Sequence, residues 1–270
     1  MQNDDVVRSI ARRMIPGGLY RTLSDALNSY KVIVKEGYGL WRQISNLSNL
    51  SSDKKKQIEK LTLKSLKHPF YVRPGTLDAH NLVSCVIREE YGLLPKNFPD
   101  PRWMIDAGVY TGDTTVYFLN RFPKLNVIGL EANRDNFKIA SMNLKPYGER
   151  VEILFRALWK SSCKLKLKGD LNGSHVEEIS SDLDVDYDVY GLSIADIVQK
   201  YNISEIDILK MDIEGAEATV FESGYEEWLP KVNLLIIEIH GDRCFNVVEK
   251  ALLKFNFKMT RYRSVYYCSR

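Results

Sequence analysis

The chain has 270 residues, with 38 lysines and arginines against 35 aspartates and glutamates, which gives a net charge of +3. A composition of 44% hydrophobic and 27% charged residues excludes a disordered or fibrous chain and is typical of a globular protein. Apolar runs such as Leu234–Ile237 are far shorter than the ~20 residues that a membrane-spanning helix needs, so we expect none.

The cysteines and the N-terminus indicate where the protein works. The cysteines lie far apart, without a CxxC motif or a metal-ligand spacing to histidine, which argues against a zinc site or a disulfide framework and for a reducing compartment. Asp4 and Asp5 stand where a signal peptide would be basic and apolar. We therefore expect a cytoplasmic protein, located at the inner face of the membrane if its acceptor is lipid-linked.

Residues 1–67 are predicted to form a mainly helical N-terminal segment. Val6, Ile10 and Met14 recur at helical spacing beside basic residues, and a second helix is expected over residues 53–66. The first helix could lie on a membrane surface or pack against a second copy of the chain, so peripheral membrane contact and a homo-oligomer both stay open. Residues 1–100 carry 16 basic and 10 acidic side chains, an excess that indicates a solvated surface rather than a nucleic-acid partner.

The rest of the chain, residues 68–270, is predicted to be an α/β domain. An extended stretch over 69–76, a helix over 77–94 and a proline-rich linker over 95–101 come first. From about residue 101, β-rich and helical runs alternate, which predicts a parallel sheet covered by helices on both faces. The last two strands are joined by a tight turn, so they must pair antiparallel. The expected strands are 103–107, 127–130, 151–158, 206–212, 234–240, 257–263 and 265–269, and the expected helices are 113–121, 134–144, 192–201, 215–222 and 243–255.

A cofactor site is predicted where the first strand of the sheet ends, because ligands of open α/β sheets bind beyond the carboxyl ends of the strands. Gly108 and Gly112 let the backbone approach a ligand, and Glu131, at the end of the second strand, can accept both hydroxyls of an adenosine ribose. The glycine spacing is neither GxGxxG nor a phosphate loop with its lysine, which disfavours NAD and ATP. Asp106 suits a cofactor that carries an ammonium group, such as S-adenosylmethionine.

Several stretches of the sequence together resemble the FkbM family of S-adenosylmethionine-dependent methyltransferases. The resemblance covers about residues 68–262 and implies a class I, Rossmann-like methyltransferase fold and methylation of hydroxyls, often those of sugars. Tyr110 departs from the family, which commonly has asparagine at this position. The matching stretches are HPFYVRPGTLD from His68, DAGVYTGDTT from Asp106, GLEAN from Gly129, IDILKMDIEGAE from Ile206 and LIIEIH from Leu235.

Carried over to this sequence, the resemblance implies a contact for each part of the cofactor. Asp106, Gly108 and Gly112 would lie beside its methionine part, and Thr114 near its carboxylate. Glu131 would hold the ribose, and Ala157 ends a strand whose backbone faces the adenine. With Tyr110 and Asp212 added at the methionine end, the predicted cofactor residues are Asp106, Gly108, Tyr110, Gly112, Thr114, Glu131, Ala157 and Asp212.

Methyl transfer to a sugar hydroxyl needs a base within hydrogen-bond reach, because the hydroxyl is a poor nucleophile until it loses its proton. Lys210 and Asp212 point the same way from one strand. Glu238 and His240 do so from the next, and we predict His240 as the base because an imidazole titrates near neutral pH. Asp212 and Glu214 would position His240 or the acceptor, while Lys210 would hold the carboxylates or offset the alkoxide charge. These acidic residues could instead bind a divalent cation, which we do not expect.

The acceptor is expected to contact three stretches of the chain. Arg73, Thr76 and Asp78 lie in the stretch HPFYVRPGTLD from His68, which resembles the family and which we call the lead-in. An ion pair that anchors the helical segment explains these residues equally well. Ser174 and His175 lie in an insert between residues 163 and 191, which could cover the acceptor as a loop. With the strand-end carboxylate added, the predicted acceptor residues are Arg73, Thr76, Asp78, Ser174, His175 and Glu238.

The sequence therefore predicts an S-adenosylmethionine-dependent O-methyltransferase that acts on a hydroxyl of a glycan, a glycolipid or a sugar-containing metabolite. Two alternatives stay open. One is a metal-dependent O-methyltransferase of a small aromatic or polyketide-type acceptor, and the other is a cofactor-binding module without turnover.

Overall fold

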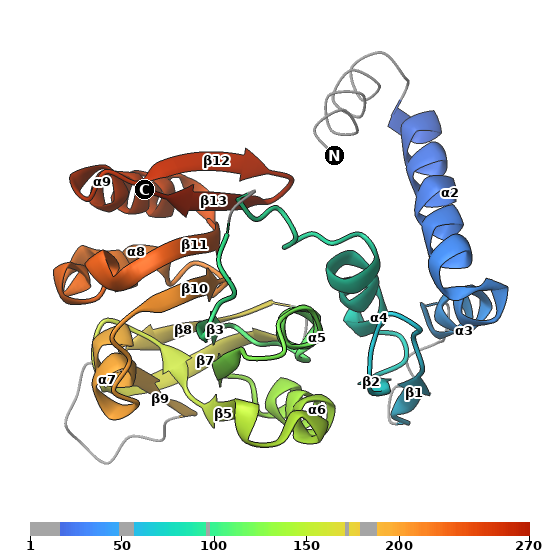
Figure 1. Cartoon of the computed structure of the whole chain (residues 1–270), viewed down its shortest axis with the longest axis horizontal. Coiled ribbons are helices and arrows are strands. Elements are labelled where there is room, and N and C mark those ends of the chain that lie inside the picture. The colour runs from blue at the N-terminus through green and yellow to red at the C-terminus, as the bar shows by residue number, and fades with distance from the viewer. Residues whose placement is uncertain (1–16, 49–56, 96–97, 171–172, 179–187) are drawn as a thin grey trace.

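The computed structural model describes residues 17–48, 57–95, 98–170, 173–178 and 188–270. A central sheet flanked by helices makes up most of the molecule, and the N-terminal helices stand beside it on the side of α4 (Figure 1). Within the described ranges, no helix is both long and apolar enough to cross a membrane. The amphipathic helix expected around residues 6–15 lies outside the described residues.

The central sheet has seven strands in the order β12-β13-β11-β10-β3-β4-β5. The strands from β11 to β5 run parallel, whereas β13 pairs antiparallel with both β11 and β12. The predicted α/β class and the C-terminal antiparallel hairpin are therefore confirmed. The strands are β3 (Trp103–Ala107), β4 (Asn126–Glu131), β5 (Val151–Phe155), β10 (Ile206–Met211), β11 (Val232–Glu238), β12 (Lys258–Tyr262) and β13 (Val265–Ser269).

Helices cover both faces of the sheet because successive strand residues point to opposite sides. In β3, Met104 belongs to the same buried cluster as Phe118 on one face, whereas Ile105 packs with Leu252 on the other. The helices predicted over 113–121 and 134–144 have the predicted bounds. One face carries α5 (Asp113–Arg121), α6 (Arg134–Leu144) and the turn η3 (Lys145–Arg150), and the other carries α7 (Ile194–Lys200), α8 (Glu217–Glu222), the turns η4 (Tyr225–Glu227) and η5 (Leu229–Lys231), and α9 (Gly241–Lys254).

The segment before the sheet differs from the prediction in two places. Residues 59–61 form a strand rather than part of a helix, because Leu61 and Leu63 alternate with exposed residues and the strand pairs with residues 70–72. The helix expected over 77–94 ends at Ile87, and Glu89 then adopts a left-handed φ of 52°. The two strands lie on either side of the predicted domain boundary at 67/68, which stays a prediction. The elements are α2 (Gly17–Glu36), α3 (Tyr38–Ser48), β1 (Glu59–Leu61), β2 (Phe70–Val72), α4 (Asp78–Leu82) and the π-helical turn η2 (Val83–Ile87).

A second sheet replaces the loop that was expected between residues 163 and 191. Its order is β6-β9-β7-β8, and its hairpin of β7 and β8 pairs Asp170 with Gly173. The alternating sequence Lys164–Lys168 has the period of a strand, which explains why a loop was the wrong expectation. The strand predicted over 151–158 divides between the two sheets at Arg156. The strands are β6 (Ala157–Leu158), β7 (Lys164–Asp170), β8 (Gly173–Glu178) and β9 (Val189–Leu192).

Candidate functional site

A cavity opens at the carboxyl ends of β3, β4, β10 and β11, the edge of the sheet where the sequence predicts a cofactor. The structure brings most of the predicted cofactor residues and three of the predicted catalytic residues to this cavity. Among the predicted residues, its lining includes Gly108, Tyr110, Thr114, Glu131, Ala157, Lys210, Asp212, Glu214 and Glu238, and does not include Arg73, Thr76, Asp78, Asp106, Gly112 or His240.

The turn after β3 approaches the turn after β10 so closely that only glycine fits. Gly108 has a φ of +81°, and a Cβ atom on it would lie 1.8 Å from the carbonyl oxygen of Asp212. The backbone N–H of Asp212 donates to the carbonyl of Ala107 at 3.0 Å. This contact places Asp212 beside the glycine turn. Asp212 is predicted both as a cofactor residue and as a catalytic residue, and both roles need this position.

Glu131 lies at the end of β4 with its carboxylate fixed by the backbone. One oxygen accepts from the N–H of Tyr110 at 2.7 Å, and the other accepts from the N–H of Asn133 at 2.8 Å. The side chain is buried, and this burial raises its pKa to about 7 against the opposing effect of the two hydrogen bonds. A buried carboxylate that still lines the cavity can accept hydrogen bonds from two adjacent hydroxyls.

The first turn of α5 presents a second carboxylate that the sequence reasoning missed. Gly112 precedes the helix in a left-handed conformation, so its role is in the backbone turn rather than in the cavity lining. Asp113 lines the cavity and accepts from the N–H of Thr114 at 2.6 Å. Burial raises the pKa of Asp113 to about 6. Its position at a helix start, directly after the predicted glycine motif, was the signal that could have identified it.

Asp106 and Lys210 form a buried pair, of which Lys210 also lines the cavity. Lys210 Nζ lies 3.3 Å from Asp106 Oδ1 and also donates to the carbonyl of Gly108. Thr115 Oγ1 donates to the other Asp106 oxygen at 2.6 Å. Although burial lowers the pKa of Lys210, its attraction to Asp106 and Asp212 raises that pKa overall. Lys210 is therefore occupied in holding the strand ends together, and the predicted contact of Asp106 with a cofactor ammonium stays a prediction.

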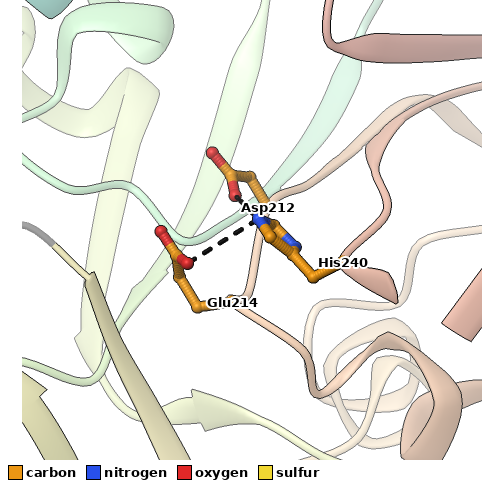
Figure 2. A group of neighbouring side chains, drawn as sticks. All are labelled: Asp212, Glu214 and His240. Atoms are coloured by element: carbon orange, nitrogen blue, oxygen red, sulfur yellow. Dashed lines mark ion pairs between the residues drawn. The ribbon is translucent and has the colours of Figure 1, made fainter. Parts of the chain in front are cut away.

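One ring nitrogen of His240 faces Asp212 and Glu214 (Figure 2). The other ring nitrogen faces a third carboxylate, that of Glu217. Its Nδ1–H donates to Glu217 Oε1 at 2.8 Å, and Nε2 lies 3.6 Å from Glu214 Oε2 and 3.9 Å from Asp212 Oδ1. The hydrogen bond to Glu217 raises the pKa of His240 to about 9, against the effect of burial and with the help of Asp212 and Glu214. One ligand atom each from Asp212, Glu214 and His240 lie within 4.8 Å of one another, a spacing that a cation could bridge.

The carboxylates around His240 lie close enough to one another to raise each other's pKa. Burial and the nearby Asp212 raise the pKa of Glu238 to about 7 and also raise the pKa of Glu214. Glu214 has a left-handed φ of 54°, a strained conformation for a non-glycine residue, which commonly marks functional sites. The sequence reasoning found these residues but missed Glu90 and Tyr91, which line the same cavity from the stretch after η2.

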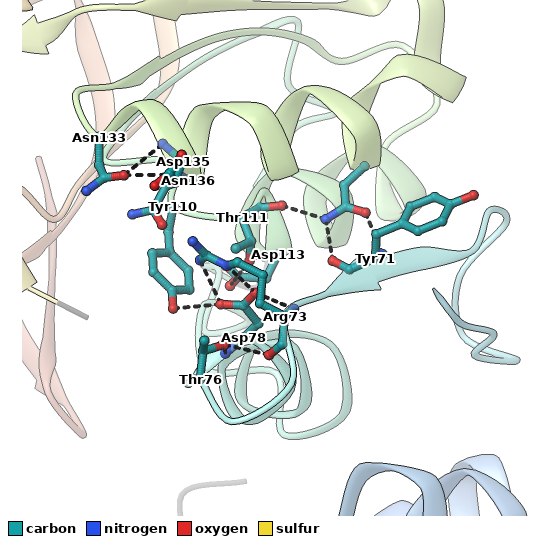
Figure 3. A network of polar contacts seen from close by, with 11 residues as sticks. Tyr71, Arg73, Thr76, Asp78, Tyr110, Thr111, Asp113, Asn133, Asp135 and Asn136 are labelled. Atoms are coloured by element: carbon teal, nitrogen blue, oxygen red, sulfur yellow. Dashed lines mark hydrogen bonds and ion pairs between the residues drawn. The ribbon is translucent and has the colours of Figure 1, made fainter. Parts of the chain in front are cut away.

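The predicted acceptor residues of the lead-in instead form a buried polar network (Figure 3). Arg73 donates to both oxygens of Asp78, at 2.8 Å and 2.9 Å, and Tyr110 Oη donates to Asp78 Oδ1 at 2.8 Å. Thr76 Oγ1 donates to the carbonyl of Arg73 at 2.8 Å. The Arg73 guanidinium lies 5.6 Å from the centre of the Tyr110 ring. The structure therefore favours the anchoring ion pair that the sequence left open, and this network supports Tyr110 from behind the cavity.

The other two predicted acceptor residues, Ser174 and His175, lie in β8 of the second sheet. Their side chains are outside the described part of the structure. Val176, in the same strand, lines the cavity, so β8 does run along it. Contact of Ser174 or His175 with an acceptor stays a prediction.

Comparison with known proteins finds one family model and several solved structures. The family model of the methyltransferase FkbM domain matches residues 106–259. A methyltransferase FkbM from Methylobacillus flagellatus KT is 15% identical with a TM-score of 0.46, and the match covers 70% of this chain and 53% of that one. This chain thus spans about half the length of that protein. A search of curated proteins finds no match.

Two other solved structures are similar at the same level. A methyltransferase from Geobacter sulfurreducens is 17% identical with a TM-score of 0.37, and the match covers 63% of this chain and 72% of that one. The tRNA (uracil-54, C5)-methyltransferase of Pyrococcus abyssi, in complex with S-adenosyl-L-homocysteine, is 12% identical with a TM-score of 0.42, with 79% and 44% covered.

Proposed function

This chain belongs to the FkbM family of methyltransferases, and we propose that it is an S-adenosylmethionine-dependent O-methyltransferase of a carbohydrate hydroxyl. Its fold is the class I methyltransferase fold, with the parallel sheet and the C-terminal antiparallel hairpin. The observation that carries the proposal is the cavity at the carboxyl ends of the strands. The fixed Glu131 carboxylate lines this cavity, and His240 lies next to Glu214, which also lines it. The sugar acceptor rests on the family resemblance of the sequence.

The residues on one side of the cavity fit S-adenosylmethionine by the chemistry of their donors and acceptors. We call Gly108, Tyr110, Asp113, Thr114 and Glu131 the cofactor side. Glu131 would accept from the two ribose hydroxyls, and Asp113, at the start of α5, would accept from the ammonium group. Gly108 lets the turn after β3 lie against the turn after β10, because a Cβ atom on it would be 1.8 Å from the carbonyl oxygen of Asp212. Bound S-adenosylmethionine would supply the methyl group on a sulfonium, which is already a reactive donor.

The proton of the acceptor hydroxyl would go to His240. Its Nδ1–H is committed to Glu217, so Nε2 is the nitrogen that can take a proton from a hydroxyl placed among Asp212, Glu214 and Nε2. Glu217 is completely buried and stabilises the imidazolium that forms. The hydroxyl oxygen bonds to the methyl carbon as the carbon–sulfur bond breaks, and the proton remains on His240 until solvent removes it.

Titration calorimetry with S-adenosylhomocysteine tests the cofactor side. We expect wild type to bind and Glu131→Ala to lose at least tenfold in affinity, because two hydroxyls lose their acceptor. Glu152→Gln, an exposed glutamate on β5 that pairs with Lys200, is the control and should bind like wild type. A folded wild type that gives no binding would overturn the proposed function.

Methyl transfer to a panel of glycans, followed with labelled S-adenosylmethionine, tests the base. His240→Gln should lower kcat about 10²–10⁴-fold, the usual contribution of a general base. With wild type, kcat/KM should rise with pH up to about 9, since the imidazole must be neutral to accept the proton. An activity that survives in His240→Gln would show that His240 is not the base, and an activity that a chelator abolishes would favour the metal-dependent alternative.

A further inference from the structure

The side of the cavity opposite the cofactor side gathers negative charge. We call Glu90, Tyr91, Asp212, Glu214 and Glu238 the acceptor side, and all five line the cavity. They come from three stretches of the chain: the segment after η2, the turn after β10 and the end of β11. Glu90 is held in place by its backbone, because Tyr267 Oη donates to its carbonyl at 2.9 Å and its own N–H donates to Ser84.

The four carboxylates of the acceptor side are only partly balanced by positive charge. In the parts of the chain that the structure describes, no lysine or arginine forms an ion pair with any of them, and His240 faces only two. Lys210, the basic residue closest to them in the lining, is held by Asp106 and by backbone carbonyls. Ionised carboxylates only accept hydrogen bonds, so a bound molecule that brings hydrogen-bond donors and positive charge would complement these groups.

Tyr91 is a second, independent sign that a ligand binds here. It is only 6% exposed and lines the cavity, yet its hydroxyl has no hydrogen-bond partner among the described residues. Asp212, Glu90 and Glu238 are its charged neighbours. The hydroxyl oxygen is not among the buried atoms without a partner, so it is accessible from the cavity, and an aromatic ring among carboxylates suits a cation, which its face attracts.

We propose that the acceptor carries a positively charged amino group close to the hydroxyl that is methylated, as an amino sugar does, and that Glu90, Glu238 and Tyr91 hold this group. The inference rests on the proposed function, whose acceptor it specifies. An ammonium group can donate to several carboxylates at once, which a neutral hydroxyl cannot do. Positive charge held beside Asp212 would also weaken the attraction of that carboxylate for the proton of His240, so the acceptor itself would help to free the base (Figure 2).

A matched set of sugars tests this proposal on the full chain saturated with S-adenosylhomocysteine. D-glucosamine carries an ammonium group at neutral pH, whereas N-acetyl-D-glucosamine and D-glucose have the same ring without the charge. Saturation-transfer NMR should give at least tenfold tighter binding of glucosamine than of either neutral sugar. Glu238→Gln and Glu90→Gln should each reduce this preference at least threefold, whereas Glu226→Gln, an exposed residue paired with Lys254, should leave it unchanged.

Three outcomes would overturn the inference. They are equal binding of glucosamine and glucose, a preference that survives in both glutamine variants, and displacement of glucosamine by MnCl₂ at micromolar concentration. The last result would mean that a metal ion supplies the positive charge at Asp212, Glu214 and His240. Because binding of S-adenosylhomocysteine is measured first in the same sample, its loss would count against the proposed function, and its presence without a sugar preference would count against this inference alone.

Discussion

The cofactor side is built from one continuous stretch of chain, from Gly108 to Glu131, whereas the acceptor side combines three stretches, the first of which lies more than a hundred residues before the other two. On the cofactor side, short local hydrogen bonds fix each group, such as the N–H of Tyr110 on Glu131. On the acceptor side, no hydrogen bond from a backbone N–H to a carboxylate is found among the described residues, and His240 lies beside only two of the carboxylates. The cofactor side suits a ligand of constant structure. The acceptor side suits a ligand whose positive charge balances the carboxylates.

The largest effect is expected where the two sides touch. Gly108→Ala would place a Cβ atom 1.8 Å from the carbonyl oxygen of Asp212 at a φ of +81°. Overpacking against backbone and the left-handed conformation together should lower the free energy of unfolding by about 4 kcal/mol or more. Binding of S-adenosylhomocysteine should be lost as well. Chemical denaturation and calorimetry measure the two effects.

Gly224→Ala is the matched control for this variant. Gly224 has a φ of +73°, but a Cβ atom there would meet nothing within 4 Å. Its substitution should therefore cost only the strain of the left-handed conformation, about 1 kcal/mol. If the two variants lost the same free energy of unfolding, the close contact between the turns after β3 and β10 would be contradicted.

The next effect concerns the lead-in network, which supports the cofactor side from outside the cavity. Arg73→Ala leaves the completely buried carboxylate of Asp78 without its main partner. Breaking a buried ion pair in this way should lower the free energy of unfolding by about 3 kcal/mol. Lys138→Ala removes one partner of an exposed pair with Asp135 and should have no measurable effect. Unchanged stability in Arg73→Ala, with loss of turnover, would restore Arg73 as an acceptor residue.

These differences explain why the sequence analysis named every residue of the cofactor side except Asp113, but missed both Glu90 and Tyr91 on the acceptor side. The glycine turn and Glu131 lie in a local strand–turn–helix pattern, whose strand and helix bounds the sequence predicts well. Glu90 and Tyr91 instead looked like the end of a helix over 77–94. That helix ends early, and the position of Glu90 depends on Tyr267, 177 residues away, a contact that no local pattern reveals. Whether Arg73 and Asp78 contact the acceptor or form an anchoring ion pair likewise depends on the direction of their side chains, which the sequence does not reveal.

A smaller effect follows from the buried Glu131, whose pKa is raised from 4.5 to about 7 by burial. The folded state holds this proton more tightly than the unfolded state. The favourable effect on stability is therefore complete below pH 4.5 and is lost as the pH rises through about 7. Between pH 6 and 8 the free energy of unfolding should fall by about 1.4 kcal/mol from this group. Comparing wild type with Glu131→Gln separates the contribution of Glu131 from that of His240, which changes stability in the same direction. If the free energies of unfolding of the two proteins changed with pH in parallel, the raised pKa of Glu131 would be contradicted.

The smallest effect compares the same chemical change on the two sides. Tyr110→Phe removes a hydroxyl that donates to Asp78, but Asp78 keeps its two bonds from the Arg73 guanidinium. The cost should be about 1 kcal/mol of unfolding free energy, with the affinity for S-adenosylhomocysteine within about twofold of wild type, because the N–H of Tyr110 still binds Glu131.

Tyr267→Phe removes the hydroxyl that fixes the backbone of Glu90 and should cost a similar amount of stability, about 1 kcal/mol. Its effect on ligands should differ, because a displaced Glu90 weakens the binding of glucosamine while the cofactor side is untouched. Two variants with equal denaturation midpoints, of which only Tyr267→Phe loses the preference for glucosamine, would separate the two sides of the cavity. If both variants instead lost S-adenosylhomocysteine binding, the two sides would form a single cooperative unit, and the charge of the acceptor could not be argued from Glu90 and Glu238 alone.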